Sequence, residues 1–177
     1  MSIILQTYNL TKAFGGLVAV SDVSIAVEAG STHAVIGPNG AGKTTLFNLL
    51  CGNFPPTSGS VFFDDKDITA VPLHRRAHLG IGRSFQIINL FPNLTVLENV
   101  RLSAQALGRD NFKLYRRASS IQRYISRALE ALEVVGLYDF ADVPASILPH
   151  GGKRKLELAI LLAADPRLLL LDEPYEG

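Results

Sequence analysis

The stretch GPNGAGKT at residues 37–44 constrains the fold more than any other part of the chain. It has the pattern G-x-x-x-x-G-K-[ST], with a strand-like apolar segment at residues 32–36 before it and the helical spacing of TLFNLLCG after it. Its glycines allow positive φ, so successive backbone N–H groups can converge on an anion. A strand, a glycine loop and a helix in this order predict an α/β fold with a phosphate-binding loop. A glycine-rich turn ahead of a core helix is the simpler alternative.

The residue types of this loop indicate how a nucleoside triphosphate and its metal would be held. A helix that begins at Lys43 adds its dipole and free amides to the loop. The Lys43 ammonium is then placed for the β- and γ-phosphates, and the Thr44 hydroxyl for Mg²⁺. The candidate nucleotide-binding residues here are Gly37, Pro38, Asn39, Gly40, Ala41, Gly42, Lys43, Thr44 and Thr45.

Two carboxylates follow an apolar run near the end of the chain. LLLL at residues 168–171 suits a buried parallel strand, and Asp172 and Glu173 come directly after it. Alone, this pattern is typical of an ordinary strand that ends at the surface. Downstream of a phosphate loop, a neighbouring parallel strand ends beside the phosphates. We therefore expect Asp172 to ligate Mg²⁺ and Glu173 to orient or deprotonate an attacking water.

The remaining periodicity predicts one domain over residues 1–177 with a helical insert. Strands are expected at residues 3–5, 17–20, 23–27 and 58–65, with a short helix at 72–78. A capping box from Thr95 to Glu98 predicts a helix that starts near Val96, and helical stretches follow to about Gly136. A helix at residues 153–164, apolar on most sides, returns the chain to α/β character. The expected divisions are residues 1–86, 87–147 and 148–177.

Composition excludes several classes of protein. Seventeen basic residues against sixteen acidic ones give a net charge of +1, so no global field attracts nucleic acid. The single cysteine, Cys51, excludes an intramolecular disulfide and favours a reducing compartment. The start of the chain lacks a signal-peptide pattern, and the longest apolar run is far shorter than the roughly 20 residues that span a bilayer. We expect a cytosolic protein that meets a membrane only through another chain.

Four motifs in order resemble those of the ATP-binding-cassette (ABC) ATPases: GPNGAGKTT, GRSFQ ending at Gln86, LPHGGKRKLELA and LLLLDEP. LTKAFGGLVAVSDVS, PTSGSVFFDDKDIT and SFQIINLFPNLTVLENV resemble, more narrowly, the ATP-binding subunits of importers for branched-chain amino acids and related amides. The resemblance spans nearly the whole chain. It implies a P-loop NTPase core with an N-terminal antiparallel β subdomain and a helical insert, which binds ATP and Mg²⁺.

The resemblance also implies roles for single residues. Phe14 stands where the family stacks an aromatic ring on adenine, although a buried core phenylalanine is the alternative. Gln86 matches the glutamine that touches Mg²⁺ and the attacking water. Gly151 belongs to the signature loop, which binds the γ-phosphate of ATP held by the other subunit. The usual LSGGQ has a serine and a glutamine where Pro149 and Gly152 stand, so a weaker contact is expected.

The implied partners follow from the same family. Two such subunits meet head to tail around ATP and move transmembrane permease subunits, and a solute-binding protein is engaged indirectly. The protein would then lie peripherally on the inner face of the cell membrane, and no nucleic acid is involved. Phe85, Ile87, Ile88, Leu90 and Phe91 either line the permease-docking groove of the insert or fill the core of that insert.

The end of the chain leaves three functions open. The family continues beyond Asp172 and Glu173 with an interface loop, further strands and a histidine, whereas all four histidines of this chain precede that pair. We therefore expect an incomplete domain that cradles nucleotide but hydrolyses it poorly. The alternatives to a transporter subunit are a soluble cassette ATPase of translation or DNA repair and a remnant that binds ATP without turnover. A GTPase is disfavoured because the chain has no N-K-x-D motif.

Overall fold

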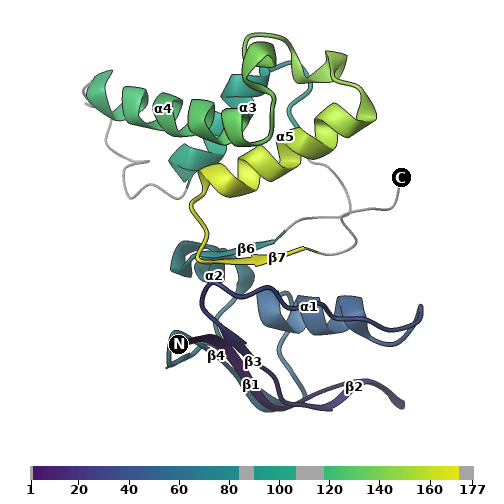
Figure 1. The fold of residues 1–177 in the computed structure, drawn as a ribbon. Coiled ribbons are helices and arrows are strands. Elements are labelled where there is room, and N and C mark those ends of the chain that lie inside the picture. The colour runs from purple at the N-terminus through teal and green to yellow at the C-terminus, as the bar shows by residue number, and fades with distance from the viewer. Residues whose placement is uncertain (1, 84–89, 107–117, 172–177) are drawn as a thin grey trace. The chain divides into compact units, whose positions relative to one another are not determined.

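The computed structural model describes residues 2–83, 90–106 and 118–171. It divides into two compact units, Met1–Leu79 and Gly80–Gly177, whose elements are labelled in Figure 1. The first unit carries the antiparallel sheet and the phosphate loop, and the second carries the helical region and a parallel strand pair. This is the α/β class that the sequence predicts.

The first unit is built on β1 (Ile3–Phe14), which pairs antiparallel with three other strands. These are β2 (Leu17–Val23), β3 (Ala26–Glu28) and β4 (Ser58–Phe63), and β5 (Lys66–Asp67) pairs with β4. The predicted continuous strand at residues 23–27 is wrong. Between β2 and β3 the chain bonds the Thr7 side chain of β1 instead: the Thr7 hydroxyl donates to the Val23 oxygen (2.9 Å) and accepts from the Ile25 N–H (3.1 Å).

The phosphate loop leads into α1 (Lys43–Cys51), which starts and ends where the sequence predicts. Gly52 closes the helix in the left-handed conformation, with φ of 80°. The strand predicted at residues 32–36 is wrong, because this segment forms no regular element and Ile36 is 91% exposed. A strand needs a neighbour for its backbone groups. No strand among the described residues pairs with this segment.

α2 (Leu73–Leu79) closes the first unit and lies one residue later than the helix predicted at 72–78. The strand predicted at residues 58–65 ends at Phe63, where a turn leads from β4 to β5. Asp64 and Asp65 have φ of 52° and 59°, a conformation that aspartate tolerates in tight hairpin turns.

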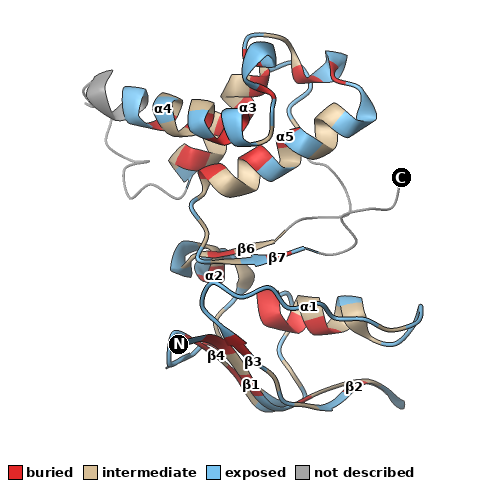
Figure 2. Ribbon diagram, viewed as in Figure 1, coloured by how far each residue is buried: buried red, intermediate tan, exposed pale blue. Residues whose placement is uncertain are grey.

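The second unit packs three helices around one apolar core: α3 (Val96–Ala106), α4 (Ala118–Val134) and α5 (His150–Ala163). Two 3₁₀ turns, η1 (Tyr138–Phe140) and η2 (Ala145–Ile147), connect α4 to α5. Figure 2 shows buried positions gathered where these helices face one another. Along α5, only Leu156, Ala159 and Ala163 are buried. The sequence predicts a helix that is apolar on most sides, whereas in the structure α5 buries a single stripe and lies at the surface.

A parallel strand pair completes the described part of the second unit. β6 (Ile81–Arg83) pairs with β7 (Leu168–Leu170), and Ile81 lies opposite Leu168. This confirms a parallel strand at residues 168–170. The predicted burial is wrong in part, because Leu169 and Leu171 are each 37% exposed. In the described ranges, no helix has the length and apolar composition needed to cross a membrane.

Candidate functional site

The phosphate loop presents backbone amides at the start of α1. Gly40 and Gly42 have φ of 82° and 87°, and Gly42 is the N-cap residue, without a side-chain cap. The first hydrogen bond of the helix runs from the Leu46 N–H to the Gly42 oxygen (2.9 Å). The amides of residues 43–45 therefore have no acceptor within the helix and are available to an anion, with the positive end of the helix dipole behind them.

Gly42 is required by the packing of the loop as well as by its φ. A Cβ at this position would clash with the backbone oxygen of Ala19 on β2. A Cβ at Gly40 would meet nothing within 4 Å. The close approach between β2 and the start of α1 therefore fixes the inner end of the loop, while its outer end faces open space.

Lys43 holds the loop in its present shape. Its ammonium donates to the carbonyl oxygens of Gly37 (2.7 Å) and Pro38 (3.0 Å). The Ala41 N–H also donates to the Pro38 oxygen (3.2 Å), which closes the turn. These contacts place the ammonium across the mouth of the loop, on the side where the free amides of α1 begin.

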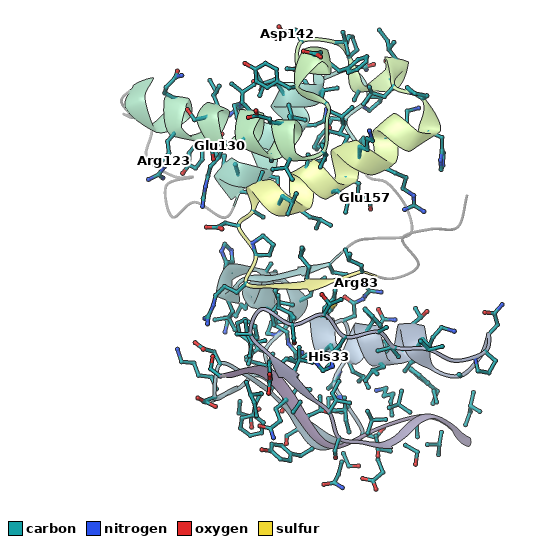
Figure 3. The ribbon with its side chains drawn as sticks, in the orientation of Figure 1. His33, Arg83, Arg123, Glu130, Asp142 and Glu157 are labelled. Carbon is teal, nitrogen blue, oxygen red and sulfur yellow. The ribbon has the colours of Figure 1, made fainter. Side chains whose placement is uncertain are left out.

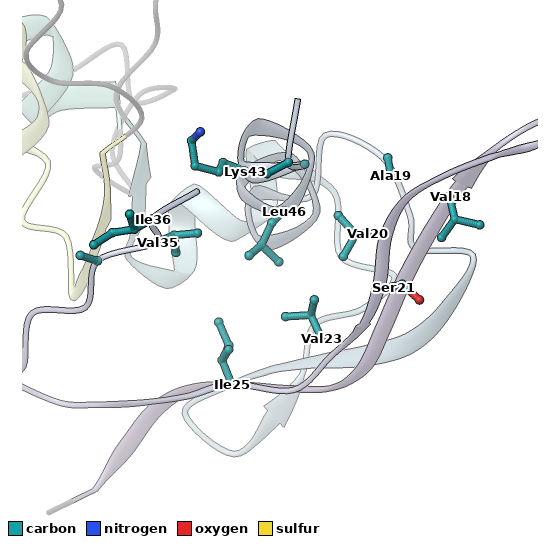
Figure 4. A pocket seen from close by; sticks show the side chains of 13 residues that line it. Val18, Ala19, Val20, Ser21, Val23, Ile25, Val35, Ile36, Lys43 and Leu46 are labelled. Atoms are coloured by element: carbon teal, nitrogen blue, oxygen red, sulfur yellow. The ribbon is translucent and has the colours of Figure 1, made fainter. Parts of the chain in front are cut away.

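A cavity of about 630 Å³ lies between α1, β2 and the segment before the loop. In Figure 4 the side chains of Leu46, Val23 and Ile25 point toward one another, and the Lys43 ammonium points away from them. Ser21 and Lys43 are the polar side chains of an otherwise apolar lining. The cavity therefore does not suit a triphosphate, and the anion-binding groups lie at its rim.

Phe14 lies at the end of β1 and is 48% exposed, which contradicts the alternative that it is a buried core residue. The Phe54 ring meets it edge to face, with centroids 5.5 Å apart. The Lys12 ammonium lies 5.2 Å from the Phe14 centroid and donates to the Pro55 oxygen (2.7 Å). Phe14 is not among the residues that line the cavity. Its ring is thus fixed from one side, and nearly half of its surface is free.

The predicted signature loop forms the first turn of α5. The helix therefore begins three residues earlier than the sequence predicts. Pro149 is the N-cap residue, and its fixed φ of −63° leads directly into the helix. Gly151 is exposed, and a Cβ there would meet nothing within 4 Å. Further along the same face, Arg154 pairs with Glu157 (3.3 Å), which Figure 3 labels. His150 is exposed.

The start of α3 holds the loop that precedes it. The Thr95 hydroxyl accepts from the Glu98 N–H (3.1 Å), which confirms one half of the predicted capping box, while the Glu98 carboxylate bonds Arg101 instead of the Thr95 N–H. Buried Asn99 accepts from the Phe91 N–H (2.8 Å) and donates to the Thr95 oxygen (2.9 Å). Phe91 is consequently held 58% exposed, whereas Leu90 packs against the helical core. Of the five apolar residues considered for docking, these two lie in the described ranges.

Arg76 of α2 is the residue that the sequence analysis missed. It is only 1% exposed, and burial lowers the pKa of its guanidinium. No motif contains it, and an arginine in LHRRAHL is expected on the surface. All of its hydrogen bonds go to backbone oxygens: Leu49 (2.8 Å), Leu50 (2.7 Å), Ile68 (2.6 Å), Thr69 (3.1 Å) and Val71 (2.7 Å).

Gln86, Asp172 and Glu173 lie outside the described residues. Arg83, at the end of β6 (Figure 3), and Leu171 are the last described residues before them. The three residues therefore stay predictions. Within the described ranges, no group of three or more His, Cys, Asp or Glu side chains could hold a metal ion.

Comparison with known proteins gives close relatives over nearly the whole chain. The ABC transporter family model matches residues 20–176. The branched-chain amino acid transport protein BraF of Pseudomonas aeruginosa is 39% identical, over 98% of this chain and 70% of that protein. The probable LivG of Archaeoglobus fulgidus is 41% identical, over 98% and 68%. The lipopolysaccharide export protein LptB of Escherichia coli is 38% identical over the same shares.

The solved structures that resemble this chain include ATP-binding cassettes. The ADP conformation of the ATP-binding cassette MJ1267 matches with a TM-score of 0.83 and 32% identity, over 100% of this chain and 71% of that one. The dimeric post-hydrolysis state of the cassette MJ0796, bound to ADP and Pi, gives 0.80 and 28%, over 98% and 75%. Both the predicted fold and the predicted family are confirmed. The chain belongs to the ABC transporter family, as an ATP-binding ATPase subunit.

Proposed function

We propose that the protein powers an importer for branched-chain amino acids or related amides, from the inner face of the cell membrane. The observation that carries this proposal is the 39% identity with BraF across 98% of the chain. LptB is nearly as similar, at 38%, so lipopolysaccharide export is the second candidate.

ATP is held first by its phosphates. The amides of residues 43–45 and of exposed Gly40 supply neutral donors, and Lys43 supplies the charge. Its ammonium now bonds two neutral carbonyl oxygens, Gly37 and Pro38. Anionic phosphate oxygens are the stronger acceptors, so the ammonium transfers to them when nucleotide binds.

Thr44, Asp172 and Gln86 would hold Mg²⁺ at this site. Thr44 is exposed in the first turn of α1, which suits a hydroxyl ligand beside the phosphates. When bound, the ion would supply positive charge beside the transferring phosphoryl group. Glu173 then orients the attacking water or accepts its proton.

The free surface of Phe14 receives the adenine ring. Phe54 and Lys12 fix the ring from the other side, so its orientation is set before the base arrives. Stacking is tolerant of base identity, because every base has a π-face. We therefore expect GTP to bind within about tenfold of ATP.

A second copy or a related subunit completes the catalytic unit. In a head-to-tail pair, the start of α5 brings Gly151 to the γ-phosphate of the ATP on the partner. Exposure of Gly151 and the free amides of that turn support this role. The helical unit, with exposed Phe91, faces the permease subunits, and a solute-binding protein is engaged through them.

Genetic complementation tests the cargo and direction. The chain is expressed in Escherichia coli lacking LivG, a protein 37% identical to it, and uptake of radiolabelled leucine is measured. We expect uptake above that of the matched Lys43→Ala variant, and no rescue of cells depleted of LptB. Rescue of the LptB-depleted cells without leucine uptake would favour the export function instead.

A further inference from the structure

The buried guanidinium of Arg76 lies at the end of α1 opposite to the phosphate loop. Its Nη1 donates to the carbonyl oxygens of both Leu49 and Leu50, in the last turn of the helix. The last carbonyls of a helix lack partners within it and carry the negative end of its dipole. A guanidinium at this end donates hydrogen bonds to those carbonyls and places a positive charge at the negative end of the dipole.

The same guanidinium also binds the segment that follows β5. It donates to the oxygens of Ile68, Thr69 and Val71. That segment is fixed to the sheet, because the Ile68 N–H donates to the Val61 oxygen of β4 (2.9 Å) and the Val61 N–H donates to the Thr69 hydroxyl (2.9 Å). β4 in turn pairs with β1, which carries Phe14.

Gly52 makes room for this arrangement. A Cβ at Gly52 would lie 2.6 Å from Arg76 Nε and 2.7 Å from the Val71 oxygen, and its φ of 80° disfavours other residues. The Gly52 oxygen also accepts from the Leu73 N–H at the start of α2 (3.2 Å). Side chain, helix end and turn therefore form one tightly packed joint.

We propose that Arg76 is a positioning residue for the phosphate loop, which it holds in register with the antiparallel sheet from the far end of α1. This inference rests on the proposed nucleotide binding. The nine residues of α1 form a rigid rod of roughly 14 Å. A shift at one end reaches the amides of Lys43 at the other, and so changes the distance from the phosphate site to Phe14.

Glycine-selective ¹⁵N labelling of the ligand-free chain tests the proposal. In Arg76→Met, the amide signals of Gly40 and Gly42 should move, and the Kd for ATP should rise about tenfold, because small displacements of binding groups have large effects. Arg75→Met is the matched control, an exposed arginine next to it on α2, and should change neither quantity. A purely structural role would lower the melting temperature and leave both loop signals in place.

Two further variants decide the matter if Arg76→Met does not fold. Arg76→Lys keeps the charge but offers three donors for five oxygens, and Gly52→Ala pushes on the guanidinium from the opposite side. Both should move the Gly40 and Gly42 signals, and unmoved signals in folded protein would overturn the proposal. A parent chain that fails to bind ATP would contradict the proposed function instead, since the ligand-free signals report on Arg76 without nucleotide.

Discussion

Two helices of this protein, α1 and α5, have a glycine in or next to their first turn and no side-chain cap, and the surroundings of the two glycines differ. At the start of α1, Gly42 has a φ of 87° and no space for a Cβ beside Ala19. At the start of α5, Gly151 has open space around its Cα. The glycine of α1 is therefore required by the packing of its own chain. The glycine of α5 is not required in this way, and only the proposed contact with the γ-phosphate of ATP on a partner would require it.

Gly42→Ala should show the largest effect on this difference. The added Cβ clashes with the Ala19 backbone and takes a strained φ, so we expect a loss of about 3 kcal/mol in the free energy of unfolding, together with loss of ATP binding. Denaturant unfolding gives the first quantity and calorimetry the second. Gly40→Ala is the matched control, strained in φ but sterically free, and should cost about 1 kcal/mol. Equal losses in the two variants would contradict the packing argument.

Lys43→Ala should separate binding from folding at the same helix. The variant loses two hydrogen bonds to loop carbonyls and the cation for the phosphates. We expect the ATP affinity to fall about 100-fold, with stability changed by about 1 kcal/mol. Titration of the folded variant with ATP measures the loss. An ATP affinity equal to that of the parent chain would show that the loop is not part of the nucleotide site.

Gly151→Ala should leave the isolated chain unharmed. Alanine is the better helix former, so stability should stay constant or rise by up to about 1 kcal/mol. ATP binding by single chains should be retained, whereas ATP-dependent association of two copies should weaken about tenfold because the added methyl blocks a close backbone approach. Analytical ultracentrifugation with ATP measures this association. Gly152→Ala is the comparison variant. A Cβ at Gly152 would lie 3.3 Å from side-chain atoms of Leu148 and Pro149, whereas a Cβ at Gly151 meets nothing within 4 Å.

The sequence predicts best where the chemistry is local. The phosphate loop, the limits of α1 and the Thr95 cap each depend on residues a few positions apart. The strand at residues 32–36 was wrong because a strand depends on a neighbour, which no local pattern supplies. The start of α5 at His150 was missed because a Gly-Gly pair has low helix propensity, although the first amides of a helix need no partner within it.

Arg76 shows the same limit at the far end of α1. Its burial depends on carbonyl groups of Leu49 and Leu50, which are distant in sequence, and on the absence of a side chain at Gly52. Composition assigns such an arginine to the surface. Asp172, Glu173 and Gln86 were identified from motif order, and their roles are still predictions.

The start of α3 provides a third helix end, closed by the chain itself, and its pH dependence should be small. The Glu98 carboxylate in the first turn accepts hydrogen bonds from Arg101 Nε (2.9 Å) and Nη2 (2.7 Å), which lower the pKa of Glu98. A lowered folded-state pKa means that the pair stabilises the fold above the unfolded pKa, and that this stability is lost as pH falls through the folded value.

The Glu98 side chain is 40% exposed, so solvent screening limits the contribution to about 0.5 kcal/mol at pH 7. Glu98→Gln should therefore lower stability by that amount at pH 7 and make no difference at a pH well below the folded-state pKa of Glu98, as measured by urea unfolding. Glu130→Gln, at an exposed position of α4 (Figure 3), is the control, and an equal pH-dependent loss in it would show that general surface charge, rather than the pair at α3, is responsible.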